Sequence, residues 1–284
     1  MKHIVSKQWL LARLYEPDIV IADCRFDLSD PSEGRRAYDL DRIPGAVYFD
    51  LEQDLSGPVQ EHGGRHPLPD VDELAEKLGK AGIDNTVKVV AYDDQGGAIS
   101  SRLWFLLKYM GHDEVYVLDE GYTAWKDAGF PVSSSAPAVV VPKTFVPRLR
   151  PEMLADIDEV REASRAIRSG DPSYALIDSR EKSRYLGQVE PLDKAAGHIP
   201  GAINRYWKDN LDEKGKWKSS EELQRQYEDL RDKKQIIVYC GSGVTACPNL
   251  LALNEAGLEQ VKLYAGSWSD WISYSENLIA IGEE

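Results

Sequence analysis

One cysteine of this chain lies in a setting that suits nucleophilic chemistry. Cys240 follows the apolar run QIIV (235–238) after one intervening residue, Tyr239, and precedes a stretch that is typical of a helix. Glycines at 241 and 243 permit the tight curvature that aims consecutive backbone N–H groups inward as an anion-binding nest. Such a nest beside a helix N-terminus favours the thiolate of a cysteine, whose pKa is otherwise about 8.5. The loop therefore predicts a nucleophile whose charged forms are stabilised by backbone N–H groups.

Two other interpretations of this loop have to be weighed. A lone cysteine is commonly a small buried residue of the core with no chemical role. A phosphatase loop of the Cys-x5-Arg type needs a guanidinium group to hold the phosphoryl oxygens, but the residue at the arginine position after Cys240 is Ala246. Without that arginine, the loop favours transfer of a group smaller than phosphoryl.

The composition is that of an ordinary globular protein. At 284 residues the chain is long enough for two domains of about 140 residues each. The formal net charge of −14 disfavours nucleic acid and anionic membrane surfaces, which are bound through clustered lysines and arginines. No apolar run approaches the roughly 20 residues that cross a bilayer, and we identify no signal peptide at the N-terminus. We therefore expect a cytoplasmic protein with no nucleic acid and no membrane partner.

The cysteines argue against a disulfide framework. Cys24, Cys240 and Cys247 are the only three, and no spacing of cysteine and histidine resembles a zinc site. We expect reduced thiols and no metal.

Four stretches of the first half recur in the same order in the second half. Such ordered self-similarity indicates a duplicated domain. The prolines between the two copies disfavour a regular helix there, so we expect domains at 1–131 and 152–284 joined by a linker at 132–151. The matched stretches are VIADCR (20–25) with LIDSR (176–180), RIPGAVYFDL (42–51) with HIPGAINRYW (198–207), VKVVAYDDQGG (87–97) with KQIIVYCGSGV (234–244), and EVYVLDEGYTAW (114–125) with QVKLYAGSWSDW (260–271).

Short β-branched runs alternate with helix-like stretches in both halves. DIVIAD (18–23) and VKVVAY (87–92) lack the polar alternation of a half-exposed sheet, which favours strands buried on both sides. Helix-like patterns cover 71–82 and 219–233. This alternation predicts an α/β fold used twice, each copy a parallel sheet flanked by helices. In such sheets ligands bind at the carboxyl ends of strands, where Cys240 falls.

The chain resembles the two-domain rhodanese-type sulfurtransferases over nearly its whole length. The motifs that carry the resemblance are GHIPGA (197–202), YCGSGVTA (239–246) and YAGSWSDW (264–271), with RIPGA (42–46) as the echo in the first half. The resemblance implies tandem rhodanese-like domains, of which the C-terminal one is catalytic. Asp93 occupies the position of the cysteine in the first copy, and a carboxylate cannot carry sulfane sulfur. The first domain is therefore expected to be inactive.

By this resemblance the reaction is a double displacement without a cofactor. The Cys240 thiolate attacks the sulfur of a small-molecule donor, becomes a persulfide and passes the outer sulfur to cyanide, a thiol or a thioredoxin-like acceptor. The backbone N–H groups of the loop are expected to stabilise the negative charge on that sulfur. The residues expected to bind substrate in this way are Gly241, Gly243, Val244 and Thr245.

The neutral loop CGSGVT resembles that of the 3-mercaptopyruvate sulfurtransferases, whereas thiosulfate enzymes carry two basic side chains there. The resemblance implies that Ser242 helps to protonate the leaving enolate, coupled to His66 and to an acid at Glu52. Arg184 is expected to bind the carboxylate of the donor. A second arginine of the family aligns with Asp193, where this chain departs from the pattern.

Two alternatives to 3-mercaptopyruvate transfer stay open. One is a thiosulfate:cyanide sulfurtransferase, and the other is a catalytically idle module of the same fold that binds a partner.

Several other side chains are expected to be structural. These are Arg180 in an ion pair, His198 in a turn, Trp268 and Trp271 in the core, and Cys247 on the helix after the loop.

Overall fold

The chain forms two compact units. The structure, a computed structural model, describes residues 3–137, 139–258 and 260–283. Unit 1 comprises Met1–Gly57, Leu68–Arg150 and Leu211–Trp217, and unit 2 comprises Pro58–Pro67, Pro151–Asn210 and Lys218–Glu284. Each unit thus includes a short segment from the opposite half of the sequence.

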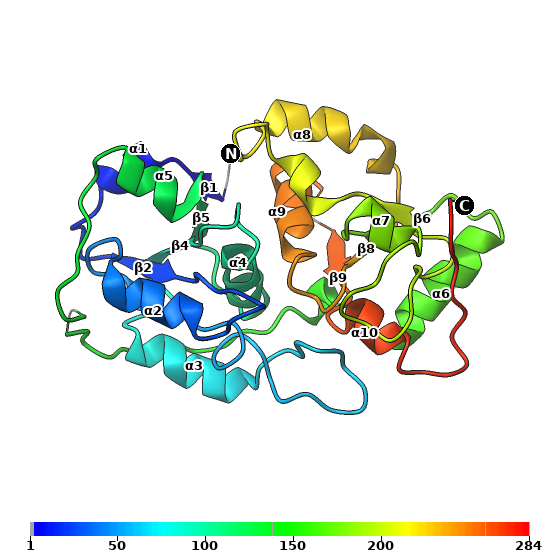
Figure 1. Cartoon of the computed structure of the whole chain (residues 1–284), viewed down its shortest axis with the longest axis horizontal. Helices are drawn as coiled ribbons and strands as arrows, with labels where there is room; N and C mark the ends of the chain where they lie inside the picture. The colour runs from blue at the N-terminus through cyan, green and yellow to red at the C-terminus, as the bar shows by residue number, and fades with distance from the viewer. Residues whose placement is uncertain (1–2, 138, 259, 284) are drawn as a thin grey trace. The chain divides into compact units, whose positions relative to one another are not determined.

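Unit 1 is built on a five-stranded parallel sheet with the strand order β1-β5-β4-β2-β3 (Figure 1). Its longest buried helix, α4, packs against β4 and β5. The strands are β1 (Ile4–Val5), β2 (Ile19–Asp23), β3 (Val47–Tyr48), β4 (Lys88–Tyr92) and β5 (Val115–Leu118). The helices are α1 (Lys7–Leu11), α2 (Glu33–Leu40), α3 (Val71–Lys80), α4 (Ser100–Tyr109) and α5 (Gly121–Asp127).

Unit 2 is built on a four-stranded parallel sheet with the strand order β7-β6-β8-β9. Helix α6 packs on β6, and α9 packs on β9 and α8. The strands are β6 (Tyr174–Asp178), β7 (Ile203–Asn204), β8 (Gln235–Tyr239) and β9 (Val261–Leu263). The helices are α6 (Ile157–Arg168), α7 (Lys182–Tyr185), α8 (Ser220–Gln226), α9 (Cys247–Glu255) and α10 (Ser267–Trp271), with short 3₁₀ helices at η1 (Pro151–Met153), η2 (Trp207–Asn210) and η3 (Glu228–Leu230).

The two sheets repeat one topology, as the internal sequence repeat predicts. The order β5-β4-β2-β3 of unit 1 corresponds to β9-β8-β6-β7 of unit 2. A buried ion pair follows the equivalent strand in each unit, Asp23 with Arg25 and Asp178 with Arg180, both at 2.6 Å. The expectation of an α/β fold with two parallel sheets flanked by helices is confirmed.

Helix starts follow local signals, whereas one helix end does not. Both α6 and α8 begin with a capping box, in which Asp156 pairs with Glu159 and Ser219 with Glu222. The helical pattern of 219–233 nevertheless gives an α-helix that ends at Gln226. Tyr227 leaves helical geometry, and its buried hydroxyl donates to Asn210. A tertiary contact therefore shortens a helix that the sequence pattern alone would extend.

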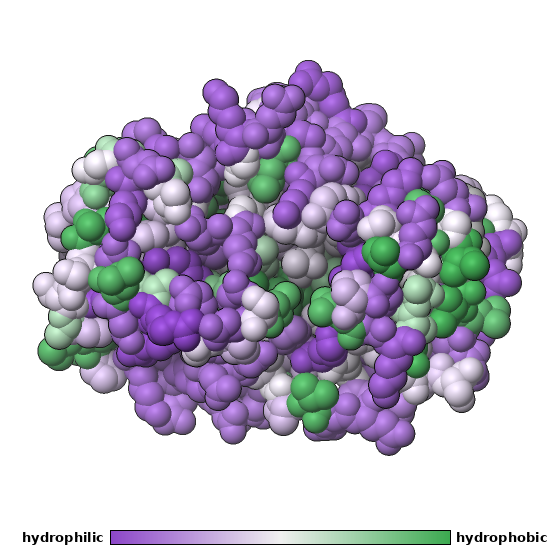
Figure 2. All heavy atoms as spheres, viewed as in Figure 1, coloured by the Kyte–Doolittle hydropathy of each residue, from purple (hydrophilic) through white to green (hydrophobic). Residues whose placement is uncertain are grey.

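The expected core tryptophans are buried in unit 2. Trp268 and Trp271 join the cluster that lies against β6 and β8. Polar and charged residues cover most of the face shown in Figure 2, in keeping with the charge of −14. No helix among the described residues is long and apolar enough to cross a membrane.

Candidate active site

Cys240 lies at the carboxyl end of β8, and its backbone is tied to α10. The Cys240 N–H donates to Oγ of Ser267 at 3.1 Å, and its carbonyl accepts from the N–H of Trp268 at 3.0 Å. The next carbonyl, that of Gly241, accepts from the N–H of Ser269 at 2.9 Å. The cysteine is 1% exposed. These hydrogen bonds fix the backbone of Cys240 and Gly241 against α10.

The loop turns its backbone toward the sulfur of Cys240. The Gly243 N–H donates to Sγ at 3.2 Å, as expected of a nest donor, and Val244 and Thr245 continue the loop toward α9. Gly243 has a φ of +79°, and a Cβ at this position would lie 2.2 Å from the carbonyl oxygen of Ala265. Glycine is therefore required here both by backbone conformation and by space.

Cys247 is the first residue of α9, the helix that follows the Cys240 loop. Its Sγ donates to the carbonyl of Gly243 at 3.4 Å, and the residue is fully buried. All three cysteines are free thiols. Cys247 thus supports the loop from the helix side, which agrees with a structural role.

Ser242 and His66 are brought into direct contact. Nδ1 of the His66 ring lies 2.7 Å from Oγ of Ser242, and both residues are buried. His66 belongs to the segment Pro58–Pro67, which is part of unit 2. Glu52 belongs to unit 1, is exposed, and its N–H donates to Asp50. The hydroxyl and the imidazole therefore form a pair beside the cysteine, and Glu52 is not a member of that cluster within unit 2.

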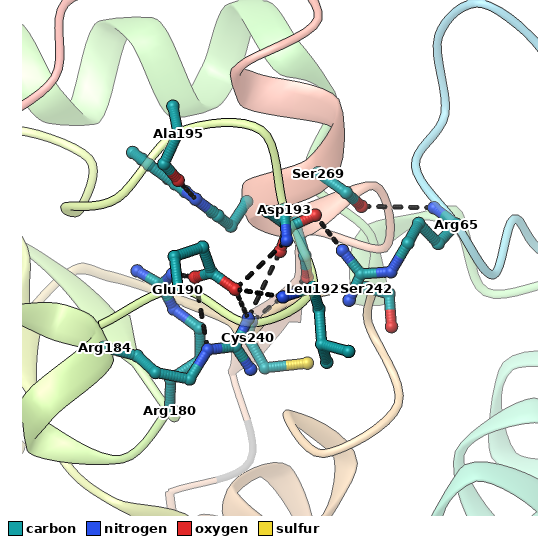
Figure 3. Close-up of polar contacts among 12 residues, drawn as sticks. Arg65, Arg180, Arg184, Glu190, Leu192, Asp193, Ala195, Cys240, Ser242 and Ser269 are labelled. Atoms are coloured by element: carbon teal, nitrogen blue, oxygen red, sulfur yellow. Dashed lines mark hydrogen bonds and ion pairs between the residues drawn. The ribbon is translucent and has the colours of Figure 1, made fainter. Parts of the chain in front are cut away.

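Arg184 faces the loop from α7 and is held by two carboxylates (Figure 3). Its Nη2 donates to Glu190 at 2.6 Å and to Asp193 at 3.2 Å. Glu190 also accepts from the backbone N–H of Asp193. A Cβ built on Gly241 would lie 3.5 Å from Nη2 of Arg184, which places this guanidinium against the backbone next to Cys240.

A second arginine near the loop was missed by the sequence reasoning. Arg65 forms an ion pair with Asp193, and its Nη2 lies 3.1 Å from the position of a Cβ on Gly241 (Figure 3). Burial lowers the pKa of the Arg65 guanidinium. The positive charge of Arg184 lowers this pKa further, whereas the charge of Cys240 acts to raise it. In the sequence, the only signal for Arg65 was its position directly before the candidate residue His66. This position does not indicate that Arg65 pairs with Asp193.

Arg180 and His198 are structural, as expected. Arg180 is buried and forms a bidentate pair with Asp178. Burial alone would lower the pKa of Arg180, but the charge of Asp178, the hydrogen bonds to it and the charge of Glu190 act together to raise the pKa. His198 stacks on the ring of Tyr185 with centroids 3.9 Å apart.

In unit 1, the loop equivalent to the Cys240 loop is filled by the side chain of Asp93. The Asp93 carboxylate accepts from the N–H groups of Gln95, Gly97, Ile99 and Ser100, at 2.8–2.9 Å. The N–H groups of this loop are therefore satisfied internally. Among the described residues, no group of three or more His, Cys, Asp or Glu side chains is arranged to hold a metal ion.

The chain is similar to known proteins over nearly its full length. It matches the Rhodanese-like domain family at residues 6–128 and again at 159–274. It is 44% identical to a probable 3-mercaptopyruvate sulfurtransferase of Pseudomonas aeruginosa, covering 99% of this chain and 98% of that protein. It is 33% identical to a thiosulfate sulfurtransferase of Mus musculus, covering 94% and 91%. The crystal structure of SseA from Escherichia coli, described with the 3-mercaptopyruvate sulfotransferases, matches with a TM-score of 0.79 and 31% identity, covering 95% of this chain and 100% of that one.

Proposed function

Because the chain belongs to the rhodanese-like family, we propose that it is a sulfurtransferase that moves sulfur from 3-mercaptopyruvate to a thiophilic acceptor through a persulfide of Cys240. The observation that carries the proposal is the Cys240 loop, with the Gly243 N–H aimed at Sγ. A buried core cysteine would need no such donor. The full-length similarity to a probable 3-mercaptopyruvate sulfurtransferase supports the choice of donor.

In the first half-reaction, the Cys240 thiolate attacks the sulfur of 3-mercaptopyruvate. The S–S bond forms as the C–S bond breaks, and the electron pair of that bond passes to the three-carbon fragment as an enolate. The enolate takes up a proton and leaves as pyruvate. The Ser242 hydroxyl, in contact with His66, is the proposed route for this proton.

The persulfide then transfers its outer sulfur. Backbone N–H groups of Gly241, Gly243, Val244 and Thr245 would stabilise the negative charge on that sulfur. An acceptor such as cyanide, a thiol or a thioredoxin-like protein attacks it and regenerates the Cys240 thiolate. Arg184 would hold the carboxylate of the donor in the first step. A cytoplasmic location, where thiols stay reduced, suits this cycle.

We also propose a division of labour between the domains. The stretch 1–131 would be an inactive rhodanese-like domain, 132–151 the linker and 152–284 the catalytic domain. The self-filled loop around Asp93 supports an inactive first domain. The segment that carries Arg65 and His66 would be its contribution to the chemistry of unit 2.

Mass spectrometry after incubation with donor tests the proposal. The protein should gain about 32 Da, the mass of one sulfur atom, and lose it on treatment with a reductant or with cyanide. An unchanged mass with every donor would leave the idle binding module as the better description.

Thiosulfate is the second candidate donor, since similar proteins include thiosulfate sulfurtransferases. A comparison of kcat/KM for the two donors decides between them.

A further inference from the structure

Asp193 bridges two arginines with opposite oxygens of one carboxylate. Its Oδ1 accepts from Nη1 of Arg65, and its Oδ2 accepts from Nη2 of Arg184 at 3.2 Å (Figure 3). The Asp193 side chain is only 3% exposed. A carboxylate of the protein itself therefore occupies the space between two guanidinium groups, in the geometry that a carboxylate ligand would adopt.

Both guanidinium groups lie next to the nucleophile. The position of a Cβ on Gly241 is 3.1 Å from Nη2 of Arg65, and 3.5 and 3.6 Å from the two Nη atoms of Arg184. Gly241 directly follows Cys240. A pocket of about 430 Å³ has both Arg65 and Asp193 in its wall. This volume is larger than a three-carbon anion, so a small donor can reach Arg65 and Asp193 from this pocket.

The two arginines differ in how firmly they are held. Arg184 is 16% exposed and is anchored by a second carboxylate, that of Glu190, at 2.6 Å. Arg65 is 32% exposed, and the carboxylate that it pairs with is Asp193. Exchange of one carboxylate partner for another costs least at the arginine that is less enclosed and has fewer competing contacts.

We propose that Arg65 binds the anionic group of the sulfur donor beside Cys240, and that Asp193 holds its guanidinium in place and gives it up when the donor binds. The inference rests on the proposed sulfurtransferase function and adds a specificity-determining residue to it. Residue 193, which aligns with a second arginine of the family, is an aspartate in this chain. Arg65 supplies a positive charge close to the loop instead. Asp193 acts as an internal competitor of every anionic donor.

Steady-state kinetics with 3-mercaptopyruvate separates this role from a structural one. We expect Arg65→Gln to raise KM about tenfold or more, a loss of roughly 1.4 kcal/mol of binding, with a much smaller change in kcat. Arg65→Lys keeps the charge but loses the planar guanidinium group, so its KM should lie between those of the wild type and Arg65→Gln. Asp193→Asn removes the competitor while keeping the shape, so KM should fall several-fold below that of the wild type.

Binding of pyruvate to the Cys240→Ser protein, measured by calorimetry, gives a readout that does not depend on turnover. Pyruvate carries the carboxylate of the donor and no sulfur. Arg65→Gln in this background should weaken its affinity, and Asp193→Asn should strengthen it. An Arg65→Gln protein with unchanged KM and unchanged pyruvate affinity overturns the inference, and so does an Asp193→Asn protein with a raised KM. Failure of the wild type to gain sulfur from any donor counts instead against the proposed function, and the pyruvate result stands independently of it.

Discussion

Nδ1 of His66 and Oγ of Ser242 lie 2.7 Å apart, although 176 positions separate the two residues in the chain. The contact places an imidazole, which exchanges protons near neutral pH, behind a hydroxyl that belongs to the cysteine loop. Ser242 follows Cys240 by two positions, and both residues are buried. Under the proposed function, this pair would supply a proton to the three-carbon fragment that leaves the donor sulfur as Cys240 attacks it.

Removal of either partner should slow the transfer from 3-mercaptopyruvate. We expect Ser242→Ala and His66→Gln each to lower kcat by roughly 100-fold, the lower range for general acid catalysis. Because the two act as one unit, the double variant should be little worse than either single variant. Thiosulfate supplies the internal control, since its leaving group is not an enolate. Equal losses with both donors would contradict a role in enolate protonation.

The nucleophile is tested by serine substitution at each of two cysteines. Cys240→Ser should abolish sulfur loading, because a hydroxyl neither ionises near neutral pH nor forms a persulfide. Cys247→Ser is the matched control, since serine can keep the hydrogen bond to the Gly243 carbonyl. It should retain most of the activity. Residual transfer above a tenth of the wild-type rate in Cys240→Ser would refute the assignment.

Gly243 tests whether the shape of the loop matters as much as the thiol. Alanine there would place its Cβ 2.2 Å from the Ala265 carbonyl oxygen at a φ of +79°, so the loop must move and take the Gly243 N–H away from Sγ. We expect Gly243→Ala to lower kcat/KM by at least about tenfold, equivalent to roughly 1.4 kcal/mol. Gly257→Ala is the control, with a φ of +88° and nothing within 4 Å of the new Cβ. It should cost some stability and leave kcat/KM near the wild-type value.

Local sequence signals predicted the strands and the repeat because these depend on short stretches and their order. The run QIIVY forms β8 as expected, and the Cys240 loop follows it. The pairing of Arg65 with Asp193 was not predictable in this way. It depends on a segment from the first half of the chain that becomes part of unit 2, and no local pattern encodes such a contact. The same holds for Tyr227, whose contact with Asn210 accompanies the early end of α8.

Asp93 should be important for stability and without effect on chemistry. Its two oxygens accept four backbone N–H groups and the Ser100 hydroxyl in a buried loop. Asp93→Asn turns an amide NH₂ toward N–H donors, so we expect a loss of about 3 kcal/mol, measured by urea denaturation. Asp93→Cys in a Cys240→Ser background should not gain sulfur. A persulfide trapped on residue 93 would show that the loop of unit 1 is competent after all.

His112 should make the stability of the protein depend on pH below neutrality. The residue is 1% exposed, and its ring lies 6.0 Å from that of Phe145. Burial lowers the pKa of His112, while backbone hydrogen bonds and the charges of Asp113 and Glu114 act in the opposite direction. In the unfolded chain a histidine titrates near 6.5. As pH falls below that value the unfolded state binds more protons than the folded state, so stability present above about pH 6.5 is lost toward the lower folded pKa.

The prediction concerns how the effect of substitution changes with pH. His112→Gln removes the titrating group and some packing, so its cost relative to the wild type should be largest at pH 7.5 and smaller at pH 5. Phe145→Leu disturbs the same contact without removing an ionisable group and should cost the same at both values. Urea denaturation at the two pH values measures the difference. If His112→Gln and Phe145→Leu shift the free energy of unfolding by pH-independent amounts, protonation of this buried imidazole does not contribute to acid destabilisation.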